Sequence, residues 1–308
     1  MRALQRFFFE PQTTAPMALV RVAWGAVMTI WALTLLPDVD PFLTTGALRY
    51  EQPGAAGSWN PLDVISWSGA PLVTCFILIA AAAAVTVGYR TRATTVVAVL
   101  CLISLQRTNA TIFNSGDLFL RQIGFAVALS PCGLLWSVDA RRARRHGRDI
   151  APWRAPWGMR LLQLEVAIGY FLSGWAKARG QTWRDGRALE LALRIEDLQR
   201  VRAPEWIFGH PELLDALTTS TVAFECAFLF LVWNRRLRPW VLGIGVAFHL
   251  GIDIFLDVGF FSIAMWVAYL AFIFPPVAAQ IVRRFDPTGV GSPDRGAEAV
   301  PLAVQPAQ

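Results

Sequence analysis

The sequence predicts an all-α polytopic membrane protein, a bundle of about eight transmembrane helices. Hydrophobic residues make up 55% of the 308 residues and charged residues only 16%, and the mean hydropathy of +0.44 lies above that of soluble globular domains. Apolar stretches that approach the 20 or so residues needed to cross a bilayer recur along the chain. Their approximate positions are 17–36, 71–87, 93–113, 118–136, 157–176, 217–233, 239–256 and 260–277.

Arginines gather in alternate connections between these stretches and predict their orientation. They precede the first stretch, lie between the second and third, the fourth and fifth, and the sixth and seventh, and follow the eighth. The exception is the longer connection 179–215, where six arginines are accompanied by seven acidic residues. By the positive-inside rule the alternate connections are cytoplasmic, so we expect a multi-pass protein of the inner (plasma) membrane with both termini in the cytoplasm. The net charge of +6 is then a consequence of topology, and we expect no nucleic-acid partner.

The segments between and after the expected spans have their own patterns. Residues 187–201 place apolar side chains at the three-four spacing of an amphipathic helix, but they are too charged to span, so we expect this helix on the outer membrane surface. The transmembrane domain is expected to comprise residues 1–285, followed by a disordered cytoplasmic tail at 286–308 that is rich in Pro, Gly and Ala. The four cysteines show no close pairing and are interpreted as buried thiols, so we expect no metal.

Lys177 is the only lysine among the 28 Lys and Arg residues, and it lies at the end of the fifth apolar stretch. Arginine keeps its proton in proteins, whereas a desolvated lysine can lose it and act as a base, so a lysine at membrane depth is a candidate functional group. The alternative is the codon bias of a GC-rich genome, in which lysine is scarce everywhere. Residues seven apart share a helix face, so Gln163 and Tyr170 align with Lys177, and Ser173 lies four residues before it.

Two other polar clusters lie near the ends of expected spans. His249 and Asp253 are four residues apart, and a carboxylate can hold an imidazole as a positioned donor or acceptor; the alternative is a histidine that only packs. Asn114 and Asp117 lie in the turn after the third stretch, with Arg121 four residues further on; the alternative is a helix cap braced by an ion pair. The predicted topology places both clusters and the lysine in the outer half of the bundle, so we expect them to form one site.

Five short motifs form an ordered set along the chain. They are Gly88-Tyr89-Arg90, Trp136-Ser137-Val138-Asp139, Tyr170-Phe171-Leu172-Ser173-Gly174-Trp175-Ala176-Lys177, Trp183-Arg184-Asp185-Gly186, and Phe248-His249 followed by Phe261-Ser262-Ile263-Ala264-Met265. In order and spacing this set resembles the membrane domain of the vitamin K-dependent gamma-carboxylases, the horizontally transferred transmembrane (HTTM) family. The resemblance extends over most of residues 15–285.

The resemblance implies that Lys177 deprotonates a reduced quinone of the vitamin K or menaquinone type. It implies a quinone or membrane lipid as ligand and a peptide or protein substrate on the outer face. At the third turn the carboxylases carry an Asn-His pair, whereas Asn114 is followed here by Ser115. The expected catalytic residues are Lys177, His249 and Asp253, and the expected cofactor-binding residues are Asn114, Asp117, Arg121, Tyr170, Ser173 and Trp183.

A function of a different class is also open. The same bundle could serve a non-catalytic membrane protein that binds a lipid or a protein partner, such as an accessory or immunity factor. A transporter is a third alternative, because it too would carry buried charges, although the spans lack the matched Gly/Pro breaks of internally repeated transporters. Replacing Lys177 with arginine separates the first two classes, because arginine keeps the charge but cannot act as a base.

Overall fold

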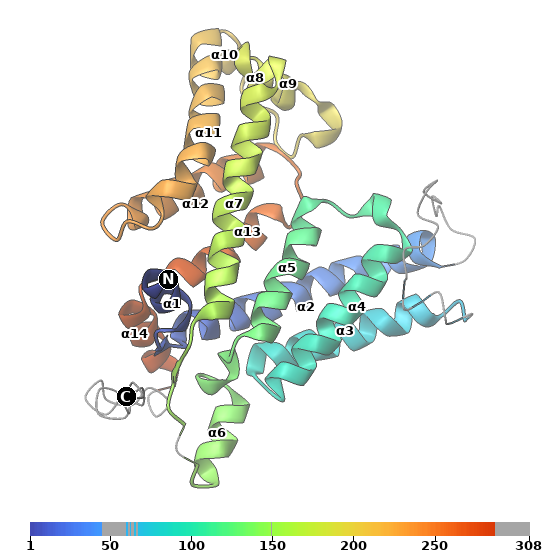
Figure 1. Ribbon diagram of the computed structural model, residues 1–308. Coiled ribbons are helices and arrows are strands. Elements are labelled where there is room, and N and C mark those ends of the chain that lie inside the picture. Colours follow the sequence, from blue (N-terminus) through green and yellow to red (C-terminus); the bar gives the residue numbers. More distant parts are fainter. Residues whose placement is uncertain (45–59, 61, 63–64, 66, 149, 287–308) are drawn as a thin grey trace. The chain divides into compact units, whose positions relative to one another are not determined.

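The structure is a computed structural model that describes residues 1–44, 60, 62, 65, 67–148 and 150–286. These residues are mostly helical (Figure 1), which confirms the prediction of an all-α, membrane-type fold. The chain divides into two compact units. Unit 1 contains Met1–Ile112, Leu120–Arg160 and the residues from Ile273 onward, and unit 2 contains Phe113–Phe119 and Leu161–Phe272.

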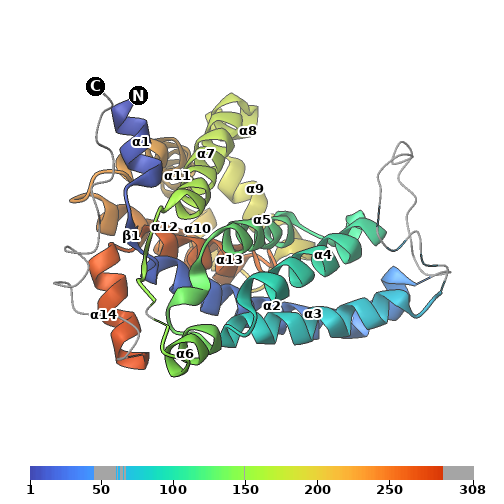
Figure 2. The same cartoon turned by 60° about the horizontal axis from the view of Figure 1, so that its bottom comes forward.

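Three long helices form the main layer of unit 1. α3 packs against both α2 and α4, and the three helices lie side by side in Figures 1 and 2. The strands β1 and β2 form one short antiparallel pair, in which Gln12 lies opposite Arg154. The elements of unit 1 are α1 (Arg2–Phe9), β1 (Gln12–Thr13), α2 (Ala15–Leu43), α3 (Ala70–Val87), α4 (Thr91–Thr108), most of α5 (Ser115–Leu129), α6 (Val138–Arg145), β2 (Trp153–Arg154) and α14 (Pro275–Phe285), with 3₁₀ turns at Ala110–Ile112 and Cys132–Leu134.

Small residues set the close approach of α2 and α3. A Cβ atom at Gly25 would lie only 2.6 Å from Thr86 Oγ1 and 2.7 Å from Thr86 N, so only glycine allows this contact. The neighbouring Trp24 is fully buried, and its Nε1 donates a hydrogen bond to Leu120 O at 2.7 Å. Small residues at helix crossings and satisfied indole groups are typical of helices that pack inside a membrane.

Arg21 is a fully buried arginine on α2. Its Nη1 donates to Val85 O at 2.9 Å and to Thr86 O at 3.2 Å, and its Nη2 donates to Trp136 O at 2.5 Å. The last carbonyl groups of a helix have no partner within the helix, and a cation at that end is favoured by the helix dipole. Arg21 therefore caps the carboxyl end of α3 and ties it to the segment before α6.

Two of the sequence motifs form one junction in unit 1. Gly88 ends α3 with φ of 72°, and its backbone O accepts a hydrogen bond from Asp139 N at 3.0 Å. The Asp139 carboxylate accepts hydrogen bonds from Arg90 N at 2.8 Å and from Thr91 N and Thr91 Oγ1, both at 2.7 Å. An acidic group at the first turn of α4 satisfies its free N–H groups and complements its dipole. These motifs thus have a structural role.

The expected tail lies almost entirely outside the described residues, which end at Asp286. Asp286 itself is buried, with an exposed fraction of 3%. Its carboxylate accepts hydrogen bonds from Trp136 N at 2.9 Å and from Arg144 Nη2 at 3.0 Å. The folded domain therefore includes Asp286, one residue beyond the expected boundary at 285.

Unit 2 is built around three helices, and two of them carry five of the nine predicted site residues. The three helices are the larger part of α7, α11 and α12, and α11 contacts a folded connection made of short helices. Leu193, Ala203 and Leu214 form a small hydrophobic core in that connection. The elements of unit 2 are α7 (Trp157–Arg179) from Leu161 onward, α8 (Gln181–Arg184), α9 (Ala188–Arg194), α10 (Glu205–Phe208), α11 (Pro211–Leu231), α12 (Arg238–Phe255) and α13 (Phe261–Tyr269), with 3₁₀ turns at Glu196–Leu198 and Leu270–Phe272.

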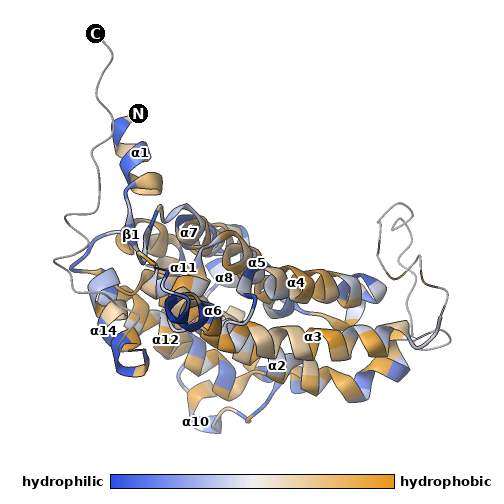
Figure 3. Cartoon of the chain, turned by 90° about the horizontal axis from the view of Figure 1, so that it is seen from below, coloured by the Kyte–Doolittle hydropathy of each residue, from blue (hydrophilic) through white to orange (hydrophobic). Residues whose placement is uncertain are grey.

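Four helices among the described residues are long and apolar enough to cross a membrane, namely α2, α3, α11 and α12. A fifth is added if the broken pair Phe261–Phe272 and Pro275–Phe285 is counted as one span. Helices α4, α5 and α7 lie at the third, fourth and fifth expected spans, but they are shorter or more polar. Figure 3 shows the contrast between the largely hydrophobic ribbons of α2 and α3 and the hydrophilic ribbon of α6.

Three expected helices end earlier than predicted. α5 stops at Leu129 and does not continue to residue 136, because Pro131 disfavours a helical backbone at Ser130. The expected span 260–277 is broken after Phe272, before the prolines that begin α14. The amphipathic helix expected at 187–201 is α9, of only seven residues, and its side chain Leu193 packs into the small core of unit 2.

Candidate functional site

Unit 2 contains all but one of the residues that the sequence predicts for the site. Arg121 is the exception, because it lies in unit 1, where its Nη1 donates to Gln106 Oε1 at 3.2 Å. The predicted residues in unit 2 are Asn114, Asp117, Tyr170, Ser173, Lys177, Trp183, His249 and Asp253. Their contacts separate them into four groups, each with different partners.

Lys177 forms the first group, and its main partner was not predicted. Its Nζ donates to Glu225 Oε1 at 2.5 Å and to Ser173 Oγ at 2.9 Å, and it lies 5.2 Å from the centre of the Trp183 ring. The Glu225 side chain is almost completely buried, with an exposed fraction of 4%, whereas that of Lys177 is 24%. The predicted proximity of Ser173 and Lys177 is confirmed.

The close approach of α7 and α11 creates this ion pair. A Cβ atom at Gly174 would lie 2.8 Å from Cys226 Sγ and 2.9 Å from Glu225 Cβ, so glycine is needed where the helices meet. The sequence signal for Glu225 was a single ionisable residue inside the apolar stretch 217–233, which by itself marks a functional candidate. Its pairing with Lys177 could not be inferred, because the two residues are 48 positions apart.

A buried hydrogen-bonded chain of three side chains forms the second group. The Tyr170 hydroxyl lies 2.6 Å from His249 Nε2 and also forms a short hydrogen bond with the Tyr269 hydroxyl. All three residues have exposed fractions of 5% or less. Gly245 on α12 leaves room for the Tyr269 hydroxyl, because a Cβ atom at that position would collide with it. Tyr269 was not predicted, because its register opposite Tyr170 depends on the packing of α13.

Aromatic rings surround these three hydrogen-bonded side chains. The Tyr170 ring stacks on Phe228 with ring centres 4.3 Å apart, and the His249 ring lies 5.3 Å from both Phe248 and Phe261. His249 Nδ1 and Glu225 Oε2 are buried atoms that have no hydrogen-bond partner among the described residues. A buried polar atom without a partner is costly and often indicates where a ligand or water binds.

Asp253 has a different partner from the one expected. The sequence predicts that it holds the His249 imidazole, but Asp253 Oδ2 accepts from Arg200 Nη1 at 3.5 Å, and His249 instead contacts Tyr170. Arg200 also pairs with Asp257 at 3.1 Å. Residues four apart share a helix face, but side-chain direction decides whether they touch.

Asn114 and Asp117 form a helix cap. Asn114 Oδ1 accepts from Gly116 N at 2.7 Å and Asp117 N at 3.2 Å, while Asp117 Oδ2 accepts from Asn114 N at 2.8 Å. This reciprocal arrangement satisfies free N–H groups at the start of α5. Asn114 Nδ2 also donates to Val258 O at 3.3 Å, which fastens the cap to the segment before α13. The capping interpretation therefore accounts for these contacts.

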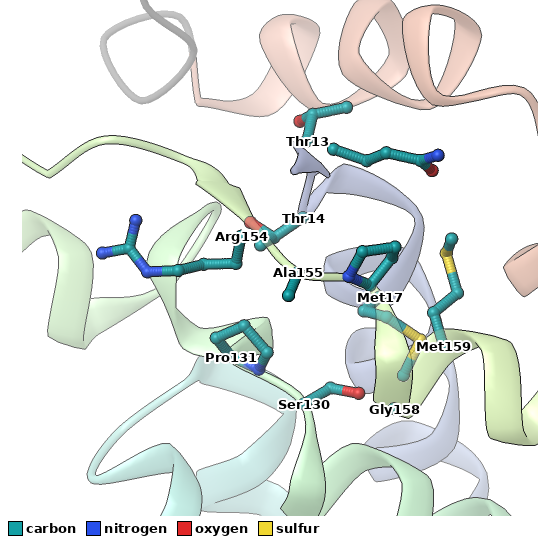
Figure 4. Close-up of a pocket in the computed structure, with 11 residues that line it drawn as sticks. Thr13, Thr14, Met17, Ser130, Pro131, Arg154, Ala155, Gly158 and Met159 are labelled. Atoms are coloured by element: carbon teal, nitrogen blue, oxygen red, sulfur yellow. The ribbon is translucent and has the colours of Figure 1, made fainter. Parts of the chain in front are cut away.

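A small cavity in unit 1 is not a candidate for a quinone. It measures about 20 Å³, and Thr14, Ser130 and Met159 are among the residues around it (Figure 4). Thr14 Oγ1 and Ser130 Oγ are buried there without a partner among the described residues. A volume of this size holds roughly one water molecule. The polar lining thus fits a bound water, and the candidate site for a larger ligand lies in unit 2.

The central position of Tyr170 leads to a test of stability. Tyr170→Phe removes both hydrogen bonds of its hydroxyl and leaves His249 Nε2 and the Tyr269 hydroxyl buried without that partner. We expect a loss of about 2–4 kcal/mol, since each unsatisfied buried group costs about 1–3 kcal/mol. Tyr269→Phe, the matched control, removes only one of the bonds and should cost less. Thermal unfolding of both variants in detergent measures the ranking, and a larger loss for Tyr269→Phe would contradict this arrangement.

Comparison with known proteins identifies the family. A family model described as the HTTM domain matches residues 9–276, which is most of the chain. This membrane-associated domain is also found in the gamma-carboxylase family. No curated protein and no solved structure gives a match. The chain therefore belongs to the HTTM family.

Proposed function

We propose that this HTTM protein is an integral-membrane enzyme that takes a proton from a membrane-soluble quinol, with Lys177 as the base. The observation that carries the proposal is the pairing of the only lysine with the buried Glu225 at 2.5 Å, next to Ser173 and Trp183. Intramembrane ionisable residues are rare and usually functional. Family membership supports the same class of chemistry, because the gamma-carboxylases share the domain.

The ion pair provides a way to generate a neutral amine. Transfer of a proton from Lys177 Nζ to Glu225 Oε1 converts an ammonium and a carboxylate into an amine and a carboxylic acid, with no change in net charge. Because this transfer separates no charge, the low dielectric of a buried site does not oppose it. The Lys177 amine can then accept a proton from a hydroxyl group, while the hydrogen bond to Ser173 Oγ holds Nζ in place.

The residues present suit a reduced quinone. Such a molecule supplies acidic hydroxyl groups on an aromatic ring. Trp183 offers an aromatic face beside Lys177 Nζ, and Glu225 Oε2 and His249 Nδ1 are buried polar atoms with unused hydrogen-bonding capacity among the described residues. Aromatic side chains with a few placed polar groups are typical of small-molecule sites.

The proposal includes a plasma-membrane location with eight crossings and both termini in the cytoplasm. It is supported by the arginine clusters in alternate connections, among them the four arginines of α6. In this topology the Lys177 end of α7 and the α9 connection lie on the outer side. A peptide or protein acceptor would then approach from that side.

A non-catalytic function remains the second candidate. The specific observation that favours it is again the Lys177–Glu225 pair, because a buried carboxylate with a cationic partner is also a stable structural arrangement. In that case the protein would bind a lipid or a protein partner, and only the charge of Lys177 would matter. Arginine would then be an acceptable replacement.

Turnover of a quinol by Lys177 variants tests the proposal. Purified protein in detergent is given reduced menaquinone or reduced vitamin K, and oxygen consumption and quinol oxidation are followed. We expect Lys177→Ala and Lys177→Arg to lose at least about 100-fold in rate, because general base catalysis contributes about 10²–10⁴-fold and arginine cannot act as a base. Arg179→Ala, an exposed basic residue two positions further along α7, is the matched control and should retain activity.

Two results would contradict the proposed enzymatic function. If the folded wild-type protein oxidises neither quinol, the binding function is favoured. If Lys177→Arg turns over at the wild-type rate, the amine is not the base. Thermal unfolding of each variant establishes that a loss of rate is not a loss of fold.

A further inference from the structure

A cationic cleft lies beside α6 in unit 1. It measures about 270 Å³ and is lined by Asp139, Arg142, Ala143, His146 and Arg148. Helix α6 carries the sequence Val-Asp-Ala-Arg-Arg-Ala-Arg-Arg, and Figure 3 shows it mainly in the blue of hydrophilic residues. The volume is far larger than a water molecule needs and can accept a phosphate-sized group.

Asp139, the one acidic residue that lines the cleft, forms its hydrogen bonds with the start of α4. Both carboxylate oxygens of Asp139 accept hydrogen bonds from the first turn of α4, from Arg90 N, Thr91 N and Thr91 Oγ1. This carboxylate therefore serves the α4 helix end and does not pair with the arginines of the cleft. The cleft keeps a net positive charge from Arg142 and Arg148.

The local backbone brings the cationic groups together. Gly147 adopts φ of 70°, which turns the chain at the end of α6, and Arg148 N then donates to Ala143 O at 3.1 Å. This is the geometry of a glycine-terminated helix, and it folds Arg148 back beside the helix. The Arg142 guanidinium lies 4.7 Å from the centre of the Tyr89 ring, a cation–π contact that orders it without neutralising it.

Arg142 and Arg148 differ from Arg144 in their ion pairing. Arg144 pairs with the buried Asp286 at 3.0 Å. In the part of the chain that the structure describes, Arg142 and Arg148 form no ion pair. Two unpaired guanidinium groups at one cleft are suited to an anionic ligand, because each can donate two parallel hydrogen bonds to phosphate oxygens.

We propose that this cleft binds the phosphate group of an anionic phospholipid of the adjacent membrane leaflet. Helix α6 lies in the short connection between α5 and α7 of a membrane protein, so lipid headgroups are the abundant phosphates at this depth. Clusters of basic residues next to membrane helices are attracted to anionic lipids. Of the arginines in and just after α6, only Arg142 and Arg148 line the cleft. The site is independent of the quinol chemistry proposed for unit 2.

Native mass spectrometry of the detergent-solubilised full chain tests the proposal with two matched variants. Phosphatidylglycerol and phosphatidylcholine are titrated separately against the wild type, Arg142→Gln/Arg148→Gln and Arg141→Gln/Arg145→Gln. The two double variants lose the same charge from the same segment, but only the first changes the cleft. We expect the wild type to prefer phosphatidylglycerol and the cleft variant to lose about 10–100-fold in affinity, since each direct, charge-assisted hydrogen bond to the phosphate contributes roughly a factor of ten. The control variant should lose less than about threefold, because Arg141 and Arg145 do not line the cleft and act on the ligand only through longer-range attraction, which salt screens.

Three outcomes would overturn this assignment. Equal losses in the two double variants would mean general attraction to a basic helix. An absent preference for phosphatidylglycerol would exclude a site for anionic lipid. Displacement of the lipid by inorganic phosphate at equal concentration would identify a site for free anions instead. Arg148→Gln alone, which leaves the Arg142–Tyr89 contact intact, keeps the test valid if the double variant does not fold.

Discussion

Glu225→Gln is expected to abolish quinol oxidation and to lower the thermal stability of the protein. The amide cannot accept the Lys177 proton, so the amine that the proposed reaction needs is not formed. We expect a loss of at least about 100-fold in rate, the usual lower range for removal of a proton-transfer group. The stability loss should be about 1–3 kcal/mol, less than for a fully buried pair, because Lys177 keeps some exposure.

Two other variants separate the proton-transfer function from the packing of α11. Glu225→Asp retains the carboxylate but shortens the side chain by one methylene, so it should not reach Lys177 Nζ and should lose most of the activity. Glu165→Gln, on α7 in the same unit, changes a half-buried carboxylate and should retain activity. The rates are measured with reduced menaquinone, and unfolding is followed in the same detergent. Full activity of folded Glu225→Gln would contradict a role for this carboxylate in proton transfer.

Arg21→Met is expected to be the most destabilising single change outside the site. It retains a long, unbranched side chain but removes the guanidinium that binds Val85 O, Thr86 O and Trp136 O. Because carbonyl groups left buried without this partner cost about 1–3 kcal/mol each, we expect a loss of roughly 3–5 kcal/mol. This corresponds to a decrease in Tm of roughly 5–15 °C for a chain of this size.

Arg21→Lys is the matched control for that prediction. Lysine keeps the positive charge at the carboxyl end of α3, but it has no planar fork with which to reach three carbonyl groups. Its Tm should lie between those of the wild type and Arg21→Met. If Arg21→Met instead unfolds at the wild-type temperature, the buried charge costs as much as its hydrogen bonds contribute, and Arg21 does not hold α3 to the segment before α6.

The Lys177–Ser173 part of the site could be predicted from the sequence, because the two residues lie on one helix. Lys177 is conspicuous as the only lysine in the chain, and Ser173 lies one helical turn before it, so their contact follows from helix geometry. For His249 and Asp253 the prediction from helix geometry was wrong. A shared helix face permits a contact, but in the structure His249 on α12 contacts Tyr170 on α7, and Asp253 pairs with Arg200 from a distant part of the chain.

Composition and periodicity by themselves determined the membrane class and the positions of α2, α3, α11 and α12, and they marked the single lysine as a candidate, because hydropathy and rare residue types are properties of the chain. Only the tertiary structure decided which side chains Lys177 and Tyr170 contact. Glu225 meets Lys177 across 48 residues because Gly174 lets two helices approach, and Tyr269 meets Tyr170 because Gly245 leaves space for its hydroxyl. Such contacts depend on the distance and rotation between packed helices, which many side chains determine together and no single segment encodes.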